Sequence, residues 1–239
     1  MTTSRRAPLT LLASFLHFDI SFMVWVLLGP LALFIAKDLD LSIAQKAFLV
    51  SVPPLGGAFF RVILGYLSDQ YGPKRVGVVS MGLTLVPLLI GWLAGTSYGV
   101  MLAVGFLLGI AGASFAVSLP LASRWYPPER QGLAMGIAGA GNSGTVLSTL
   151  FAPILAARFG WHVTLALATL PVMLAFLAFS FLASDSPTQP APQTFRSVHA
   201  RTRDRGYVVV LVFLLDHVRR FSRARELSRN LLQYRVRRR

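Results

Sequence analysis

A single arginine inside an apolar stretch is the residue of this sequence with the clearest chemical role. Arg61 follows the apolar segment 56–60 and lies eight residues before Asp69, which is about 12 Å along a helix. An arginine at that depth in a membrane costs about 2.5–3.5 kcal/mol on insertion scales, and its guanidinium stays charged. We therefore expect Arg61 to face an aqueous cavity or an anion. The alternative is a structural arginine that bonds backbone carbonyls or reaches the interface.

A glycine-rich stretch carries a second polar side chain in apolar surroundings. Residues 132–144 read GLAMGIAGAGNSG. Glycines at 132, 136, 139 and 141 would let another helix approach closely, and packing alone would explain them. Packing does not explain Asn142, because its amide needs hydrogen-bond partners in hydrocarbon. We expect Asn142, with Gly139 and Gly141 beside it, to contact a ligand, whereas Gly105, Gly109 and Gly112 are interpreted as packing residues.

Charges and glycines alternate in the segment that follows Arg61. Gly65, Asp69, Gly72, Lys74 and Arg75 fall within eleven residues. An acidic residue at a helix end, followed by a glycine turn and two basic residues, suits a gate of charges between helix ends. The alternative is a turn whose only feature is an excess of positive charge.

Asp19 and His17 lie about a third of the way into the first apolar segment. An acidic side chain inside a membrane segment is a candidate for proton coupling. The alternative is a residue near the interface that hydrogen-bonds a neighbouring helix.

The elements that must position these residues are long apolar helices. The chain has 239 residues, of which 54% are hydrophobic and 13% charged, and its mean hydropathy is +0.62. A helix needs about 20 apolar residues to cross a bilayer. Stretches of this kind recur at roughly 9–36, 46–68, 76–95, 98–122, 132–157 and 162–183. The composition predicts an all-α membrane protein with six transmembrane helices.

The remaining composition argues against an enzyme. The chain has no cysteine, its four histidines are scattered, and no pair of nucleophile and base stands out. We expect no metal, no cofactor and no catalytic residue.

The net charge of +14 is unevenly distributed along the chain. Residues 1–184 hold 10 Lys+Arg and 5 Asp+Glu, whereas residues 185–239 hold 13 and 4. This distribution argues against a nucleic-acid partner. Loop charges orient membrane proteins with the basic loops inside. One set of loops carries six basic residues and the opposite set carries three, which predicts a cytoplasmic N-terminus.

Four motifs resemble one transporter family. Segment 65–75 (GYLSDQYGPKR) resembles the loop between helices two and three of the major facilitator superfamily, although Gln70 stands where a basic residue is usual. Segments 18–25 (FDISFMVW), 124–132 (RWYPPERQG) and 138–144 (AGAGNSG), together with Arg61, resemble the nitrate/nitrite porter family within it. The resemblance covers about residues 9–184.

This resemblance implies a function and roles for particular residues. The chain would form the N-terminal six-helix half of a secondary transporter in the inner (plasma) membrane, working by alternating access. Arg61 would pair with nitrate or nitrite, Asn142 would donate a hydrogen bond, and Phe115 would pack against the anion. The second half would supply another arginine and the opposing wall.

The end of the sequence departs from this pattern. Residues 185–205 are expected to form a polar, proline-containing linker, and 206–239 a basic tail. The codons of residues 207–236 can be chosen so that a shift of one base yields an apolar, membrane-like peptide. We therefore expect an out-of-frame tail and a truncated transporter, which could pair with a second half. The alternatives are a non-transporting membrane partner or a porter for another small anion.

Overall fold

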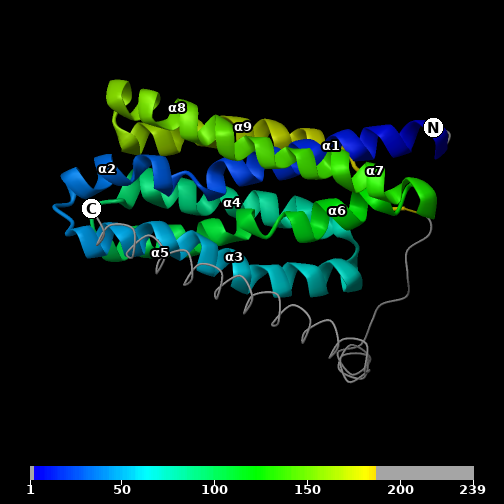
Figure 1. The fold of residues 1–239 in the computed structure, drawn as a ribbon, viewed down its shortest axis with the longest axis horizontal. Helices are drawn as coiled ribbons and strands as arrows, with labels where there is room; N and C mark the ends of the chain where they lie inside the picture. The colour runs from blue at the N-terminus through cyan, green and yellow to red at the C-terminus, as the bar shows by residue number, and fades with distance from the viewer. Residues whose placement is uncertain (1–2, 187–239) are drawn as a thin grey trace, which may run out of the picture. The chain divides into compact units, whose positions relative to one another are not determined.

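The computed structural model describes residues 3–186, with side chains from Arg6 onward. Within that range the regular elements are helices that run side by side along one axis (Figure 1). Their bounds are α1 (Thr3–Trp25), α2 (Leu28–Asp38), α3 (Ile43–Tyr71), α4 (Pro73–Ala94), α5 (Tyr98–Gly112), α6 (Phe115–Ser123), α7 (Pro128–Gly139), the 3₁₀ turn η1 (Ala140–Ser143), α8 (Gly144–Phe159) and α9 (Trp161–Leu182).

These helices correspond to the six predicted apolar segments. Five helical stretches are long and apolar enough to cross a membrane: Arg6–Asp38, Ile43–Tyr71, Pro73–Ala94, Tyr98–Ser123 and Trp161–Leu182. The segment predicted at 132–157 is also helical, but η1 divides it into α7 and α8. The prediction of an all-α membrane fold is confirmed, whereas the expected linker and tail lie almost wholly outside the described residues.

Two of the helical segments are interrupted, and a local cause is evident at the first interruption. Pro30 has no amide proton to donate to the carbonyl of Val26, and that carbonyl instead accepts from Gly29 at 2.9 Å. The chain turns there, between α1 and α2. The second change is η1, in the sequence Ala140-Gly-Asn-Ser143. Tight 3₁₀ turns inside helices often mark hinges.

Glycines allow the helices of this bundle to pack closely. A Cβ on Gly109 would overlap the backbone of Gly56, so α5 and α3 touch through their main chains. Gly105 and Gly112 face side chains of other helices, which agrees with their interpretation as packing residues. In the glycine-rich stretch, by contrast, no described neighbour lies within 4 Å of a Cβ placed on Gly132, Gly136 or Gly139. Within the described residues, no other helix therefore approaches these three glycines closely.

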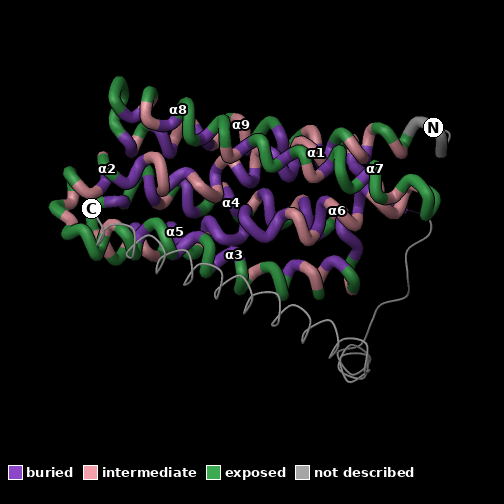
Figure 2. Tube along the Cα trace, in the orientation of Figure 1, coloured by how far each residue is buried: buried purple, intermediate pink, exposed green. Residues whose placement is uncertain are grey.

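The buried core lies between α1, α2, α4, α5 and α9. Leu28, Leu31, Met81, Leu108 and Leu165 are almost completely buried there. Figure 2 shows exposed positions recurring along α3 and along α7 and α8. These helices carry many exposed apolar residues, including Phe59, Val62, Leu133 and Leu150. Exposed apolar surface of this extent is suited to lipid or to another protein segment.

The loops at one end of the bundle are tied together by hydrogen bonds. Ser184 N donates to Thr10 Oγ1 at 3.2 Å, and Trp125 Nε1 donates to Ser184 O at 2.8 Å. The backbone amide of Lys74 donates to Asp185 Oδ1 at 2.9 Å. The beginning of α1 and the end of α9 therefore lie at the same end of the bundle (Figure 1).

Candidate functional site

Arg61 lies on an exposed part of α3, ten residues before the end of that helix at Tyr71. Its Cζ is 4.1 Å from the centroid of the Phe115 ring on α6. A guanidinium over an aromatic face is held by a cation–π interaction. The structure shows neither a carboxylate nor a backbone carbonyl bound to Arg61 among residues 6–186. The guanidinium edge is thus available, and the carbonyl-bonded alternative finds no support there.

Phe115 rests against a row of aromatic rings on α1. Its ring centroid is 6.4 Å from that of Phe18, which is 4.2 Å from Phe22, which in turn is 4.8 Å from Trp25. Trp25 Nε1 donates to the carbonyl of Pro53 on α3 at 2.9 Å. The row therefore contacts α3 at both ends, through Arg61 and through Pro53, and it supports the ring beneath Arg61.

The 3₁₀ turn η1 packs against the same part of α1. A Cβ on Gly141 would lie 2.9 Å from both Asp19 N and Phe15 O, and one on Gly144 would overlap the carbonyl of Asp19. Gly141 thus faces α1, whereas no described atom lies within 4 Å of a Cβ placed on Gly139. Asn142, between Gly141 and Ser143, is exposed. The close contacts of Gly141 and Gly144 with α1 set the position of Asn142.

Asp19 connects α1 to this turn by a hydrogen bond. Asp19 is 6% exposed, and Ser143 Oγ donates to its Oδ1 at 2.6 Å. His17, two residues earlier, points elsewhere. Its Nε2 lies 3.3 Å from Gly77 O on α4, and its Nδ1 lies 2.8 Å from Ser118 Oγ on α6. A carbonyl only accepts, so Nε2 carries a proton and the Ser118 hydroxyl can donate to Nδ1.

The predicted gate residues lie at the end of the bundle where α1 begins. Asp69 Oδ1 accepts from Arg124 Nη2 at 3.1 Å, which joins α3 to the residue after α6. Gly72 adopts φ +89° between α3 and α4, and a side chain there would be strained. The structure places Asp69, Gly72, Lys74 and Arg75 together at this end. Gly65 lies two turns earlier on α3, with no described atom within 4 Å of its Cβ position.

Sequence reasoning missed the part that four residues play in these contacts. The motif that contains Arg124 does not reveal that it pairs with Asp69, because the two residues are 55 positions apart. Asp185, assigned to the linker, accepts from the first turn of α4. Phe18 and Phe22 support Phe115, and their spacing of four residues was the available signal, because such residues share one helix face.

Comparison with protein families connects this bundle to known proteins. The pattern of the Major Facilitator Superfamily matches residues 12–230, more than nine tenths of the chain. The chain belongs to the Major Facilitator Superfamily. It is a multi-pass protein of the plasma membrane, and membership of a transporter superfamily confirms that it is not an enzyme.

Curated relatives within this superfamily are named for nitrate and nitrite. The chain is 34% identical over 170 residues to the "Probable nitrate/nitrite transporter NarK2" of Mycobacterium tuberculosis, covering 70% of this chain and 43% of the relative. It is 38% identical over 144 residues to the "Nitrite extrusion protein" of Bacillus subtilis, covering 60% and 36%. The "Probable nitrate transporter NarT" of Staphylococcus aureus is 34% identical over 167 residues, covering 70% and 42%. The chain thus spans about two fifths of the length of these relatives.

Proposed function

We propose that this superfamily member is the N-terminal half of a transporter for nitrate and nitrite, with Arg61 as the anion-binding residue. The observation that carries the proposal is the guanidinium of Arg61, exposed in an apolar helix and held 4.1 Å over the Phe115 ring. The ring occupies one face of the guanidinium and leaves its N–H edge open. Planar anions of one negative charge match that edge, because a guanidinium can donate two parallel hydrogen bonds to two oxygens. The names of the relatives support this substrate class.

We further propose that η1 forms a second part of the anion site. Asn142 would donate an amide hydrogen bond, and Gly139 would leave room for the anion, because no described atom approaches its Cβ position. Gly141 acts through packing, since its contact with α1 sets the position of Asn142. A second six-helix half would supply another arginine and the opposing wall, so that the site would lie between two halves.

The charged end of the bundle supports a gating role for Asp69 and Arg124. We propose that this ion pair, together with the Gly72 turn, Lys74 and Arg75, lies on the cytoplasmic side and changes partners during alternating access. The excess of basic residues in this set of loops supports that orientation. Asp19 is proposed as the proton-coupling residue, since it is an acidic side chain inside the membrane beside the candidate anion site.

A second candidate function is a membrane partner that does not transport. The exposed apolar side chains of Phe59, Val62 and Leu150 favour it, because a neighbouring membrane protein could pack against them. Such a protein would keep the fold and lose anion binding. A porter for another small anion is the third candidate, and it would bind its own anion through the same arginine.

Anion binding to the full chain in lipid nanodiscs tests the proposal. Nitrate and nitrite are titrated by calorimetry against the wild type, Arg61→Lys, and Arg158→Lys as the matched control at the exposed end of α8. Charged hydrogen bonds contribute about 1.5–3 kcal/mol, so Arg61→Lys should weaken binding by roughly 10- to 150-fold. Chloride serves as the comparison anion. Undiminished nitrate binding by Arg61→Lys would refute the two parallel hydrogen bonds from the guanidinium. Absence of binding by the wild type would favour the non-transporting partner.

A further inference from the structure

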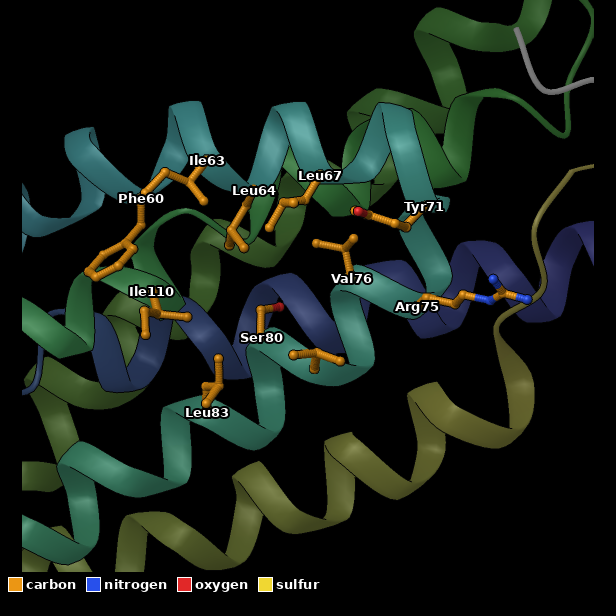
Figure 3. A pocket seen from close by; sticks show the side chains of 11 residues that line it. Phe60, Ile63, Leu64, Leu67, Tyr71, Arg75, Val76, Ser80, Leu83 and Ile110 are labelled. Atoms are coloured by element: carbon orange, nitrogen blue, oxygen red, sulfur yellow. The ribbon is translucent and has the colours of Figure 1, made fainter. Parts of the chain in front are cut away.

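A cavity lies on the side of the bundle between α3 and α4. It has a volume of about 450 Å³, and its walls are almost entirely apolar (Figure 3). Ile63 and Leu67 form one wall, and Val79 and Leu83 form the other. Ser80 also lines it, but its hydroxyl donates to Gly77 O at 3.1 Å and offers no donor to the cavity. We refer to this cavity as the α3/α4 groove.

The groove has the length of one lipid chain in one leaflet. Its lining on α3 runs from Phe60 to Tyr71, which is about 16 Å at about 1.5 Å per residue. Half of a bilayer's hydrocarbon core is about 15 Å. The groove also opens sideways, because Val79 is 61% exposed and Leu83 is 47% exposed. It therefore extends from the charged end of the bundle to about the middle of the membrane and faces the lipid.

Positive charge lies at the end of this groove that is nearest the start of α4. The aliphatic part of Arg75 lines it beside Tyr71, and Figure 3 shows the guanidinium directed beyond the apolar walls. Lys74 precedes Arg75 at the start of α4. Neither residue forms a salt bridge within residues 6–186, since Asp185 accepts from the backbone amide of Lys74 and Asp69 pairs with Arg124. An apolar slot that ends at cations without an ion pair among the described residues suits a molecule with a hydrocarbon chain and an anionic head.

We propose that the α3/α4 groove binds an anionic phospholipid, with one acyl chain between α3 and α4 and the phosphate at Arg75. Charge complementarity favours this occupant over a helix of a second copy, which would bring apolar side chains to the groove and leave Arg75 unmatched. The proposal is independent of the substrate of the transporter, because neither Arg61 nor Asn142 lines the groove.

The absence of cysteine allows a site-specific test. Val79→Cys on the groove and Leu177→Cys on the exposed side of α9 each give one thiol for a bimane fluorophore. Both sites lie about 8–9 Å from the end of their helix, so depth is matched. The labelled full chain in phosphatidylcholine nanodiscs is titrated with brominated phosphatidylglycerol or brominated phosphatidylcholine, which quench bimane on contact. The basic residues of 185–239 are common to all variants and contribute equally.

At Val79→Cys we expect quenching by phosphatidylglycerol at about fivefold lower mole fraction than by phosphatidylcholine, because one basic residue near the headgroups contributes about this factor. The preference for phosphatidylglycerol should disappear with Arg75→Gln, persist with Arg75→Lys and with the control Arg158→Gln, and be absent at Leu177→Cys.

Equal quenching by both lipids at Val79→Cys, or a preference that survives Arg75→Gln, would overturn the proposal. Protection of the fluorophore that increases with protein concentration would overturn it in favour of a second copy. Displacement of the brominated phosphatidylglycerol by glycerol 3-phosphate alone would overturn the proposal in favour of a soluble phosphate.

Discussion

Substitutions of the glycines in 132–144 should separate packing positions from open ones. A Cβ on Gly144 would overlap the carbonyl of Asp19, whereas a Cβ on Gly136 would meet no described atom within 4 Å. Both residues have ordinary helical backbone, so alanine is compatible with their conformation. We therefore compare Gly144→Ala with Gly136→Ala as a matched pair in the same span.

The two substitutions should change stability in opposite directions. In a helix, alanine is favoured over glycine by about 0.8–1.0 kcal/mol, which is the gain expected for Gly136→Ala. Gly144→Ala receives the same gain but must push η1 away from α1, and overpacking of this kind costs about 1–3 kcal/mol or more. The pair should therefore differ by roughly 1–3 kcal/mol. Gly141→Ala should fall between them, because its nearest contacts, at 2.9 Å, are less severe.

Thermal unfolding of the purified full chain in detergent measures this difference. For a chain of this size, 1 kcal/mol shifts the melting temperature by about 2–4 °C, so Gly144→Ala should melt roughly 2–12 °C below Gly136→Ala. Nitrate titration of the same samples adds a functional readout, since displacement of η1 moves Asn142. Equal melting temperatures for the pair would refute the contact between η1 and α1, and with it the argument that this contact positions Asn142.

Three further predictions concern the contacts of the candidate site and gate. Phe115→Leu should weaken nitrate binding by about 2- to 30-fold in calorimetry, because a cation–π contact with Arg61 contributes about 0.5–2 kcal/mol; unchanged affinity would show that the ring does not position the guanidinium. A double-mutant cycle of Asp69→Asn and Arg124→Gln in thermal unfolding should give a coupling of about 0.2–1 kcal/mol, and additivity would mean that the ion pair does not form. Asp19→Asn retains an oxygen acceptor for the Ser143 hydroxyl and should keep its melting temperature, while proton exchange on nitrate addition, followed with a pH-sensitive dye, should cease; persistence of that exchange would exclude Asp19 as the proton carrier.

The sequence predicted the helical segments well and their interruptions poorly. Length and hydropathy suffice to locate membrane helices, because each must supply about 20 apolar residues. The η1 turn was not predicted, since it depends on contacts with α1, more than 120 residues earlier. The open surroundings of Gly132, Gly136 and Gly139 were missed for a related reason, because a glycine pattern does not reveal whether a partner helix is present.

The candidate site was predictable in part. Arg61 stood out because a permanent charge in an apolar helix is costly, and the structure places it exposed and without an ion pair among the described residues. Its aromatic partner, Phe115, entered only through family resemblance, because pairing across 54 residues leaves no local signal. Helix geometry could have predicted the different surroundings of His17 and Asp19, because residues two apart on a helix point to nearly opposite faces.

The hydrogen bond from Ser184 N to Thr10 Oγ1 has a topological consequence. Six traverses return the main chain to the side from which it started, so the segment leaving α9 begins beside the first turns of α1. Six further traverses continuing from that point would enter the bilayer in the same direction as α1. Two such bundles would then have the same orientation in the membrane, as in parallel repeats related by an axis along the membrane normal.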